Sequence, residues 1–232
     1  MTQPPIQINA AFASPLLRTR LPQCESLNAR LRELFLKWES DPARKRRSLP
    51  TGVIKVAVYE SDFSLFDNPE PEIQALRQFC LQGTGYAIQQ LNGYSAEEMT
   101  QLRIFQHSWY HLTRHGGYTA QHNHPMASWS GVYCVDPGEP APDKPNSGAL
   151  RFLEARQTAS MYLDAGNAHW KAPFGFGEQA FQFEAGELLL FPSYLVHEVA
   201  PYYGQRERIT VAFNAWVRDA QAPSDEPFIK LR

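Results

Sequence analysis

The chain has 232 residues, of which 43% are hydrophobic and 12% aromatic, so it can form one large domain with a sizeable core. Its 22 lysines and arginines nearly balance its 24 aspartates and glutamates, which gives a formal net charge of −2. This balance produces no overall field that would attract nucleic acid or an anionic membrane. We therefore expect neither as a partner.

Targeting signals are not apparent in the sequence. The first twenty residues lack the continuous apolar core of a signal peptide, and no stretch is long and apolar enough to span a membrane. The three cysteines, Cys24, Cys80 and Cys134, form neither a disulfide framework nor a CxxC pair, which indicates a reducing compartment. We expect a cytoplasmic protein, and we interpret the basic run at 44–47 (RKRR) as a solvated loop.

The N-terminal part of the chain predicts two helices and one strand. Apolar residues recur at helical spacing over 26–38 and over 69–81. The first run ends at Asp41-Pro42 and the second just before Gly83, and both are typical helix ends. Between them, 51–59 (TGVIKVAVY) predicts a strand. The apolar positions expected to face the core are Leu27, Leu31, Leu34, Phe35 and Trp38 in the first helix, and Ile73, Leu76, Phe79 and Cys80 in the second.

From about residue 102 the pattern changes to short strands separated by turn residues. The 138–148 segment is rich in proline and glycine and predicts a loop, and 164–177 shows no period and predicts a long surface loop or lid. Many short strands after a helical preface favour an all-β core with N-terminal helices, closed or sandwiched. The predicted strands cover 103–114, 130–135, 149–154, 186–191, 195–200 and 208–217.

A candidate metal site begins with two histidines in the stretch QHNHPMASWSGVYCV. His122 and His124 have a spacing that suits a metal, but exposed loops also collect such pairs by chance. A third candidate, His197, lies in a predicted strand whose returning partner begins at Arg208. The spacing places His197 and Arg208 in neighbouring positions of one hairpin, although a bulge would change the face that His197 shares.

Arg208 stands on the polar face of an otherwise apolar strand. Ile209, Val211, Phe213 and Ala215 form one face, and Arg208, Thr210, Ala212 and Asn214 form the other. A polar face that carries an arginine suggests a lined cavity, in which the guanidinium would bind a carboxylate through two hydrogen bonds. The alternative is a surface arginine paired with Glu207 or Glu198.

Two segments of the chain resemble the iron(II)- and 2-oxoglutarate-dependent oxygenase superfamily. The sequence is similar to a bacterial branch that carries an HNHP…SGVYY segment and a later G-x-L-x-x-FPS-x-x-x-H-x-V-x-P…R-I-[ST]-x-x-FN segment. In this chain these are residues 122–134 and 186–214, and the similarity covers about 109–216. The resemblance implies a double-stranded β-helix, a cupin-like jelly roll.

The resemblance also implies roles for individual residues. His122, His124 and His197 would hold iron(II), while Arg208 and Thr210 would bind the distal carboxylate of 2-oxoglutarate. The departure from the family is His124, which stands where most members have an acidic ligand. Three neutral imidazoles leave the metal its full charge and also suit zinc, so the identity of the metal stays open at this point. A carboxylate from elsewhere, such as Asp136 or Glu154, would be able to complete the set.

Further residues are candidates for the walls of the cavity. Tyr118 is a candidate hydrogen-bond partner of the co-substrate, with core packing as the alternative. Asn214 is assigned to the same co-substrate site. Trp129 and Tyr133 are also candidates for the cavity wall, with core packing as the alternative for both, and His169 and Trp170 are candidate substrate contacts in the loop. His107, His111 and His115 stand four residues apart, but on a strand they would not converge into a second metal site.

The function that we predict is a dioxygenase that uses iron(II), 2-oxoglutarate and O2, hydroxylates an unidentified small molecule or peptide, and releases succinate and CO2. One catalytic domain would span 1–232, with 1–100 as support, 101–217 as the β-helix and 218–232 as a tail. The alternatives are a cupin-like three-histidine metalloenzyme, either a dioxygenase or an isomerase, that does not use 2-oxoglutarate, and a metal-free metabolite-binding β-sandwich. The sequence leaves the substrate and the oligomeric state open.

Overall fold

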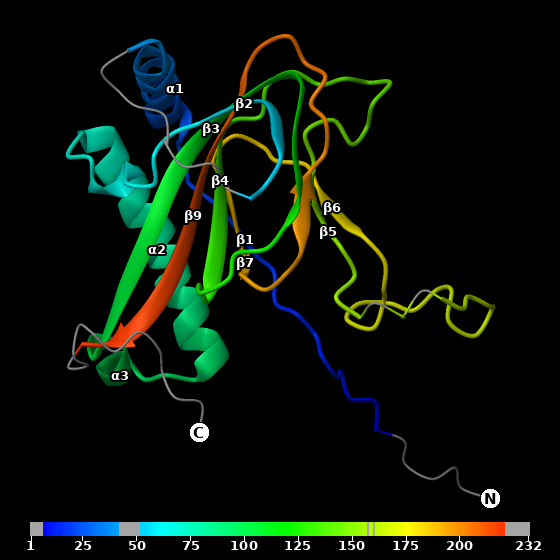
Figure 1. Cartoon of the computed structure of the whole chain (residues 1–232). Coiled ribbons are helices and arrows are strands. Elements are labelled where there is room, and N and C mark those ends of the chain that lie inside the picture. Colours follow the sequence, from blue (N-terminus) through cyan, green and yellow to red (C-terminus); the bar gives the residue numbers. More distant parts are fainter. Residues whose placement is uncertain (1–6, 42–51, 157, 160, 221–232) are drawn as a thin grey trace, which may run out of the picture.

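A computed structural model of the chain describes residues 7–41, 52–156, 158–159 and 161–220 (Figure 1). The basic run at 44–47 and the first residue of the predicted 51–59 strand lie outside these residues. No helix in the described part of the chain combines the length and the apolar character that crossing a bilayer requires. In chain order the elements are β1 (Leu17–Arg20), α1 (Glu25–Ser40), β2 (Lys55–Glu60), the 3-10 helix η1 (Leu65–Asp67), α2 (Pro71–Asn92), α3 (Ala96–Thr100), β3 (Leu102–His122), β4 (Trp129–Asp136), β5 (Leu150–Phe152), β6 (Gln179–Phe181), β7 (Glu187–Pro192), β8 (His197–Val199) and β9 (Arg208–Asp219).

The strands form one curled antiparallel sheet in the order β1-β7-β4-β9-β3-β8-β5-β6, with β2 also paired to β3. Strand β3 belongs to both halves of the curl, because its first part pairs with β9 and its last part pairs with β8. The sheet thereby folds over on itself (Figure 1). This arrangement is the predicted double-stranded β-helix, or jelly roll, with helices packed outside it.

The bend in β3 occurs at a pair of glycines. Pairing with β9 extends to Thr113 and pairing with β8 starts at Thr119, so the strand changes sheets between these two residues. Gly116 has a φ of +75°, and a Cβ on Gly117 would approach backbone and side-chain atoms to 2.7 Å, so both positions favour glycine. The prediction that the strand ends before Gly116-Gly117 was wrong, because the glycines bend the strand without ending it.

Helices α1 and α2 lie against the outer face of β4, β7, β3 and β9 (Figure 1). The periodicity predicted from the sequence is confirmed, since Leu31, Phe35, Ile73 and Leu76 are fully buried in the core between the helices and the sheet. Stacking of Phe35 on Tyr110, with ring centroids 4.2 Å apart, fixes α1 over β3. Burial of each such side chain contributes about 1.5–3 kcal/mol.

Helix α2 is longer than the sequence predicted. It continues through Gly83 and ends at Gly93, whose φ of +70° is the left-handed conformation of a helix C-cap. A Cβ on Gly83 would lie 3.2 Å from Leu188 and 3.4 Å from Leu190. Gly83 therefore serves the close approach of α2 to β7 and does not terminate the helix.

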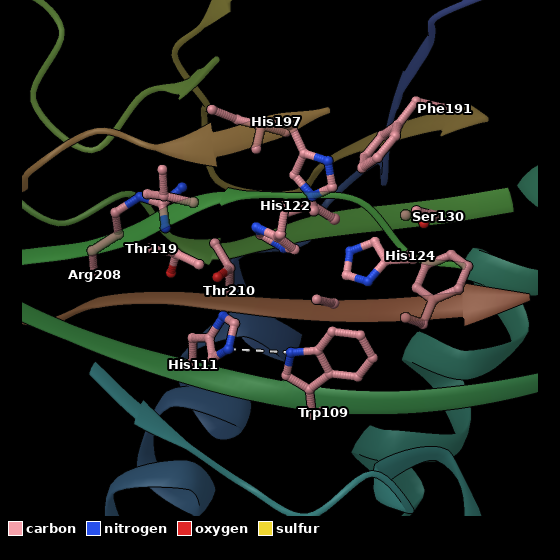
Figure 2. A pocket seen from close by; sticks show the side chains of 16 residues that line it. Trp109, His111, Thr119, His122, His124, Ser130, Phe191, His197, Arg208 and Thr210 are labelled. Carbon is pink, nitrogen blue, oxygen red and sulfur yellow. Dashed lines mark hydrogen bonds between the residues drawn. The ribbon is translucent and has the colours of Figure 1, made fainter. Parts of the chain in front are cut away.

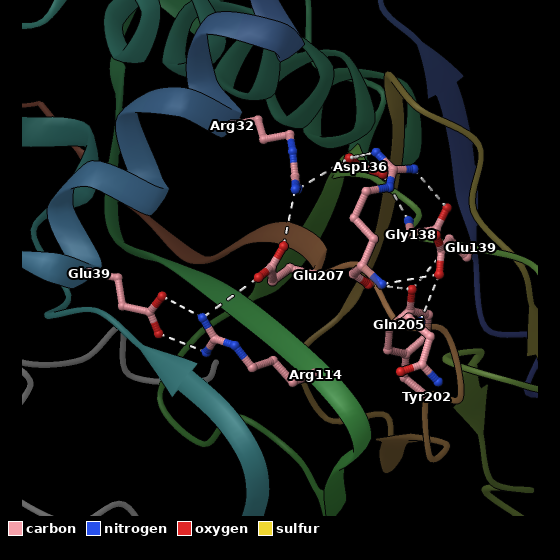
Figure 3. A network of polar contacts seen from close by, with 10 residues as sticks. Arg32, Glu39, Arg114, Asp136, Gly138, Glu139, Tyr202, Gln205 and Glu207 are labelled. Carbon is pink, nitrogen blue, oxygen red and sulfur yellow. Dashed lines mark hydrogen bonds and ion pairs between the residues drawn. The ribbon is translucent and has the colours of Figure 1, made fainter.

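An ion-pair network joins α1 to the end of the barrel near β9 (Figure 3). Arg32 contacts Glu207 at 3.0 Å and Asp136 at 3.4 Å, and Asp136 also binds Arg206 at 2.7 Å. Arg114 on β3 pairs with Glu39 of α1 at 2.6 Å. The network engages Glu207, the neighbour of Arg208 in the sequence, which matters for the site below.

Candidate metal centre

Three histidines from two strands meet inside the curl of the sheet. His122 is the last residue of β3, His124 follows it by two residues, and His197 opens β8. His122 and His197 are register partners, which brings their side chains to the same face. One nitrogen from each of the three rings lies within 4.8 Å of the others, and Figure 2 shows the rings directed at a common point.

Backbone carbonyl groups set the orientation of two of these rings. The Nδ1 of His122 lies 2.8 Å from the carbonyl oxygen of Ala120, and the Nδ1 of His197 lies 2.9 Å from that of Leu195. A carbonyl only accepts, so each Nδ1 carries the proton, and the lone pair of each Nε2 is available for a metal. The backbone N–H of His124 donates to the carbonyl of Ser193 at 3.0 Å, which anchors the third ligand to the β7–β8 turn.

The protonation state of the three rings suits metal binding. Burial lowers the pKa of all three histidines, to about 3 for His124 and about 4 for His197, and the charge of the other rings adds to the effect for these two. The rings are therefore neutral at pH 7. Neutral imidazole is the form that ligates a metal, so no proton has to be displaced when a cation binds.

The carboxylates that we considered as an additional ligand lie elsewhere. Asp136 is engaged by Arg206 and Arg32, and Glu154 binds Arg156 through both oxygens at 2.9 and 3.0 Å. Within the described residues, the cluster consists of the three histidines alone. Such a neutral set fits a divalent first-row metal such as iron(II) that keeps open coordination positions.

Arg208, the first residue of β9, is buried beside the same pocket. The predicted hairpin of His197 with Arg208 was wrong, because β8 pairs with β3 and β5, whereas β9 pairs with β3 and β4. It is 4% exposed, and burial lowers its pKa. The acids proposed as its surface partners are occupied, Glu207 by Arg32 and Glu198 by Arg151 at 2.8 Å. Among the described residues no carboxylate pairs with Arg208; its guanidinium instead lies 6.0 Å from the ring of Phe183. A buried cation without a protein counter-ion indicates that an anion binds there.

The pocket connects the histidines to Arg208 along the inner face of β9 and β3 (Figure 2). Thr210 lies one position inward from Arg208 on the same strand face, and Thr119 faces it from β3. The remaining wall is largely apolar. It includes Trp109 and Phe191, whose rings lie 6.0 Å from His124 and 4.9 Å from His197.

Two residues assigned to the site from the sequence lie outside the pocket lining. Tyr118 alternates with the pocket residue Thr119 and so faces the other side of β3. Asn214 contributes indirectly, because its side-chain oxygen accepts a hydrogen bond from Ser130, which lines the pocket, at 2.8 Å. Ser130 also bonds the hydroxyl of Ser193 at 2.8 Å, next to the backbone that anchors His124.

The other residues considered from the sequence divide between the core and the surface. Trp129 and Tyr133 are buried outside the pocket, and Tyr133 donates to Asn28 of α1 at 2.7 Å. Trp170 lines a separate cavity of about 520 Å3 between residues 12–16 and the 153–177 segment. His169 is exposed in the predicted 164–177 loop. Pocket residues that the sequence did not assign to this site include Trp109, Thr119 and His111, and His111 was considered only as part of a second metal cluster.

Comparisons with known proteins agree with this geometry. Residues 107–214 match the family described as "Putative 2OG-Fe(II) oxygenase". No curated protein matches the chain significantly.

Solved structures share the fold at low sequence identity. A Pseudomonas putida prolyl-4-hydroxylase has 17% identity and a TM-score of 0.53, over 86% of this chain and 91% of its own. The non-heme alpha ketoglutarate dependent carbocyclase SnoK from nogalamycin biosynthesis has 12% identity and a TM-score of 0.59, over 92% and 85%. The epimerase SnoN, solved with Fe3+ and alpha ketoglutarate, has 11% identity and a TM-score of 0.55, over 95% and 90%. Residues 107–214, just under half of the chain, therefore resemble this oxygenase family, and the solved structures share the fold.

Proposed function

We propose that this protein is an iron(II)- and 2-oxoglutarate-dependent dioxygenase that hydroxylates a small molecule or peptide and releases succinate and CO2. The observation that carries the proposal is that one pocket holds a convergent triad of neutral histidines and a buried arginine without a protein counter-ion. The family match and the structures of SnoK and SnoN, which are described as alpha ketoglutarate dependent or bound, support the choice of co-substrate.

The residues have separable tasks in this reaction. His122, His124 and His197 would hold the metal, with their tautomers fixed by the backbone as described above. When bound, iron(II) supplies the site at which O2 is reduced while 2-oxoglutarate loses CO2 and the substrate gains one oxygen atom. The protein's own contribution is to position the reactants and to keep water out of an apolar pocket.

Arg208 and Thr210 would hold the distal carboxylate of 2-oxoglutarate. The planar guanidinium can donate two parallel hydrogen bonds to a carboxylate, and the Thr210 hydroxyl lies on the same face to donate a third. Both side chains are almost fully buried, at 4% and 3% exposure, so their hydrogen bonds would be little weakened by water.

The substrate would approach from the side of the 164–177 loop. The cavity of about 520 Å3 on this side includes Phe152 and Leu195 in its wall. Both residues adjoin the metal site, since the ring of Phe152 lies 5.9 Å from that of His197 and Leu195 accepts the His197 hydrogen bond. We propose that the loop acts as a lid over a substrate in this cavity.

A cupin-like three-histidine enzyme that does not use 2-oxoglutarate is the second candidate. The ligand set favours it, because it contains no carboxylate. The buried Arg208 favours the first candidate, because a reaction without a dianionic co-substrate leaves this charge without a role.

Turnover of 2-oxoglutarate distinguishes the two candidates. The iron(II) protein is incubated with O2 and 2-oxoglutarate labelled at C1, with and without a metabolite extract. The labelled CO2 released from C1 and the unlabelled succinate are then measured. We expect slow metal-dependent release of both products that the extract increases. Absence of both products from fully iron-loaded protein, with and without extract, would favour the cupin-like candidate.

A further inference from the structure

A histidine that the metal triad does not include faces the same pocket. His111 lies on β3, opposite Glu60 of β2 on one side and Thr210 of β9 on the other. Side chains at paired positions project from the same face, with Cβ atoms about 4.5–5.5 Å apart. His111 and Thr210 both line the pocket, and Figure 2 shows the ring of His111 pointing toward Thr210.

Two neighbouring side chains contact the ring of His111, and a third contacts one of these two. Its Nε2 lies 2.8 Å from a carboxylate oxygen of Glu60 and 3.1 Å from the indole nitrogen of Trp109, and Lys55 contacts the same Glu60 oxygen at 3.0 Å. The side chains of Lys55, Glu60 and His111 are only 13–14% exposed. Burial by itself would raise the pKa of Glu60, but His111 and Lys55 outweigh it and lower that pKa to about 2. Glu60 is therefore a fixed anion that holds the ring.

These contacts engage Nε2 and direct Nδ1 to the pocket. A neutral ring that accepts the indole N–H of Trp109 carries its proton on Nδ1. A ring that gains a proton donates Nε2–H to Glu60 and also keeps Nδ1–H. Burial lowers the pKa of His111, so the ring is neutral without a ligand, and the nearby Glu60 carboxylate favours the remaining tautomer, with the proton on Nε2. An anion beside Nδ1 disfavours this tautomer, because the lone pair of Nδ1 would then face a carboxylate. An anion in the pocket would therefore favour the forms of the ring in which Nδ1 is a donor.

We propose that His111 is a further co-substrate-binding residue, whose Nδ1–H donates to the carboxylate held by Arg208 and Thr210, and that Glu60 positions its ring. This inference rests on the proposed function, because it takes 2-oxoglutarate as the anion. Arg208, Thr210 and His111 would surround the carboxylate on the inner face of β9 and β3. Lys55 and Trp109 act only through Glu60 and the ring.

The test compares two ligands that differ only in the distal group. 2-Oxopentanoate has the same chain as 2-oxoglutarate with a methyl group in place of the distal carboxylate. Calorimetric titration of manganese(II)-loaded protein gives the affinity ratio of the two ligands. For His111→Leu we expect the ratio to fall about ten-fold or more, since a hydrogen bond to a charged group is lost. His111→Asn, which places an amide N–H near the position of Nδ1, should recover part of the ratio.

Matched variants separate this role from a structural one. His115→Leu removes a histidine from the same strand outside the pocket and should leave the ratio unchanged. Glu60→Gln keeps the shape of the positioning group without its charge, so it should lower the ratio less than His111→Leu. If His111→Leu does not fold, the affinity ratio of Glu60→Gln is compared with that of wild type instead.

Each outcome has a distinct meaning. A folded His111→Leu or Glu60→Gln protein that binds 2-oxoglutarate with the wild-type ratio overturns the role of His111 and leaves the proposed function intact. Wild-type protein that holds manganese(II) but does not bind 2-oxoglutarate overturns the proposed function itself, and the role of His111 with it.

Discussion

Replacement of Arg208 by methionine removes the guanidinium while keeping most of the side-chain volume. Each hydrogen bond to a charged group contributes about 1.5–3 kcal/mol, and truncation of one member of a buried charge pair costs about 2–5 kcal/mol. With the arginine 4% exposed, little solvent screening reduces this loss. We therefore expect the variant to bind 2-oxoglutarate about 30-fold to several thousand-fold more weakly than wild type.

The stability of the metal-free variant gives the second half of this prediction. Among the described residues Arg208 has no carboxylate partner, so its burial costs desolvation that no ion pair offsets. We expect the free energy of unfolding of Arg208→Met to be equal to or higher than that of wild type in urea titrations. Arg206→Met, which removes a half-exposed partner of Asp136, is the control and should leave 2-oxoglutarate affinity unchanged. Wild-type affinity in Arg208→Met, measured by calorimetry on manganese(II)-loaded protein, would refute the anion-site assignment.

Three further predictions concern the metal, pH and packing. His197→Ala should lower bound metal from one equivalent to near zero in elemental analysis, whereas His169→Ala in the loop should retain it; equal metal in both would contradict the ligand assignment. Burial holds the pKa of His124 at about 3 and that of His197 at about 4, below the unfolded value of about 6.5, so the unfolded chain binds more protons between these values than the folded protein does. The free energy of unfolding of the metal-free protein should therefore fall as pH drops from about 6.5 toward 4. A free energy of unfolding that does not change over this pH range would refute this. Gly131→Ala should lower the melting temperature, because the added Cβ would overlap Phe213 and such overpacking costs about 1–3 kcal/mol of folding stability. Gly52→Ala, which has open space around it, should leave the melting temperature unchanged.

Part of the metal centre could be predicted because two of its ligands, His122 and His124, lie one residue apart in the sequence. The spacing of His122 and His124 suggested a metal by itself, and His197 was added through its distance from Arg208 and through the resemblance to the oxygenase superfamily. Arg208 was recognisable because it interrupts the pattern of an apolar strand. The pairing of His122 with His197 across β3 and β8 depends on a register shift between Thr119 and His122, which no periodicity reveals.

The walls of the pocket could not be predicted because they depend on side-chain parity over a long bent strand. Tyr118 was assigned to the site and Thr119 was not considered, yet Thr119 is the one that lines the pocket beyond the bend at Gly116-Gly117. The prediction that His107, His111 and His115 do not converge agrees with a strand at this place, but it gave no reason to expect His111 in the pocket. Its partner Glu60 comes from a strand about fifty residues earlier, and only tertiary pairing brings them together.

The most direct test of the central claim is an anaerobic titration of the iron(II) protein with 2-oxoglutarate, followed by visible absorption. Chelation of iron(II) by the 2-oxo acid in a pocket formed by His122, His124, His197 and Arg208 should produce a metal-to-ligand charge-transfer band that saturates at one equivalent. Fully iron-loaded protein that develops no such band would contradict the claim that one pocket holds both the metal and the co-substrate.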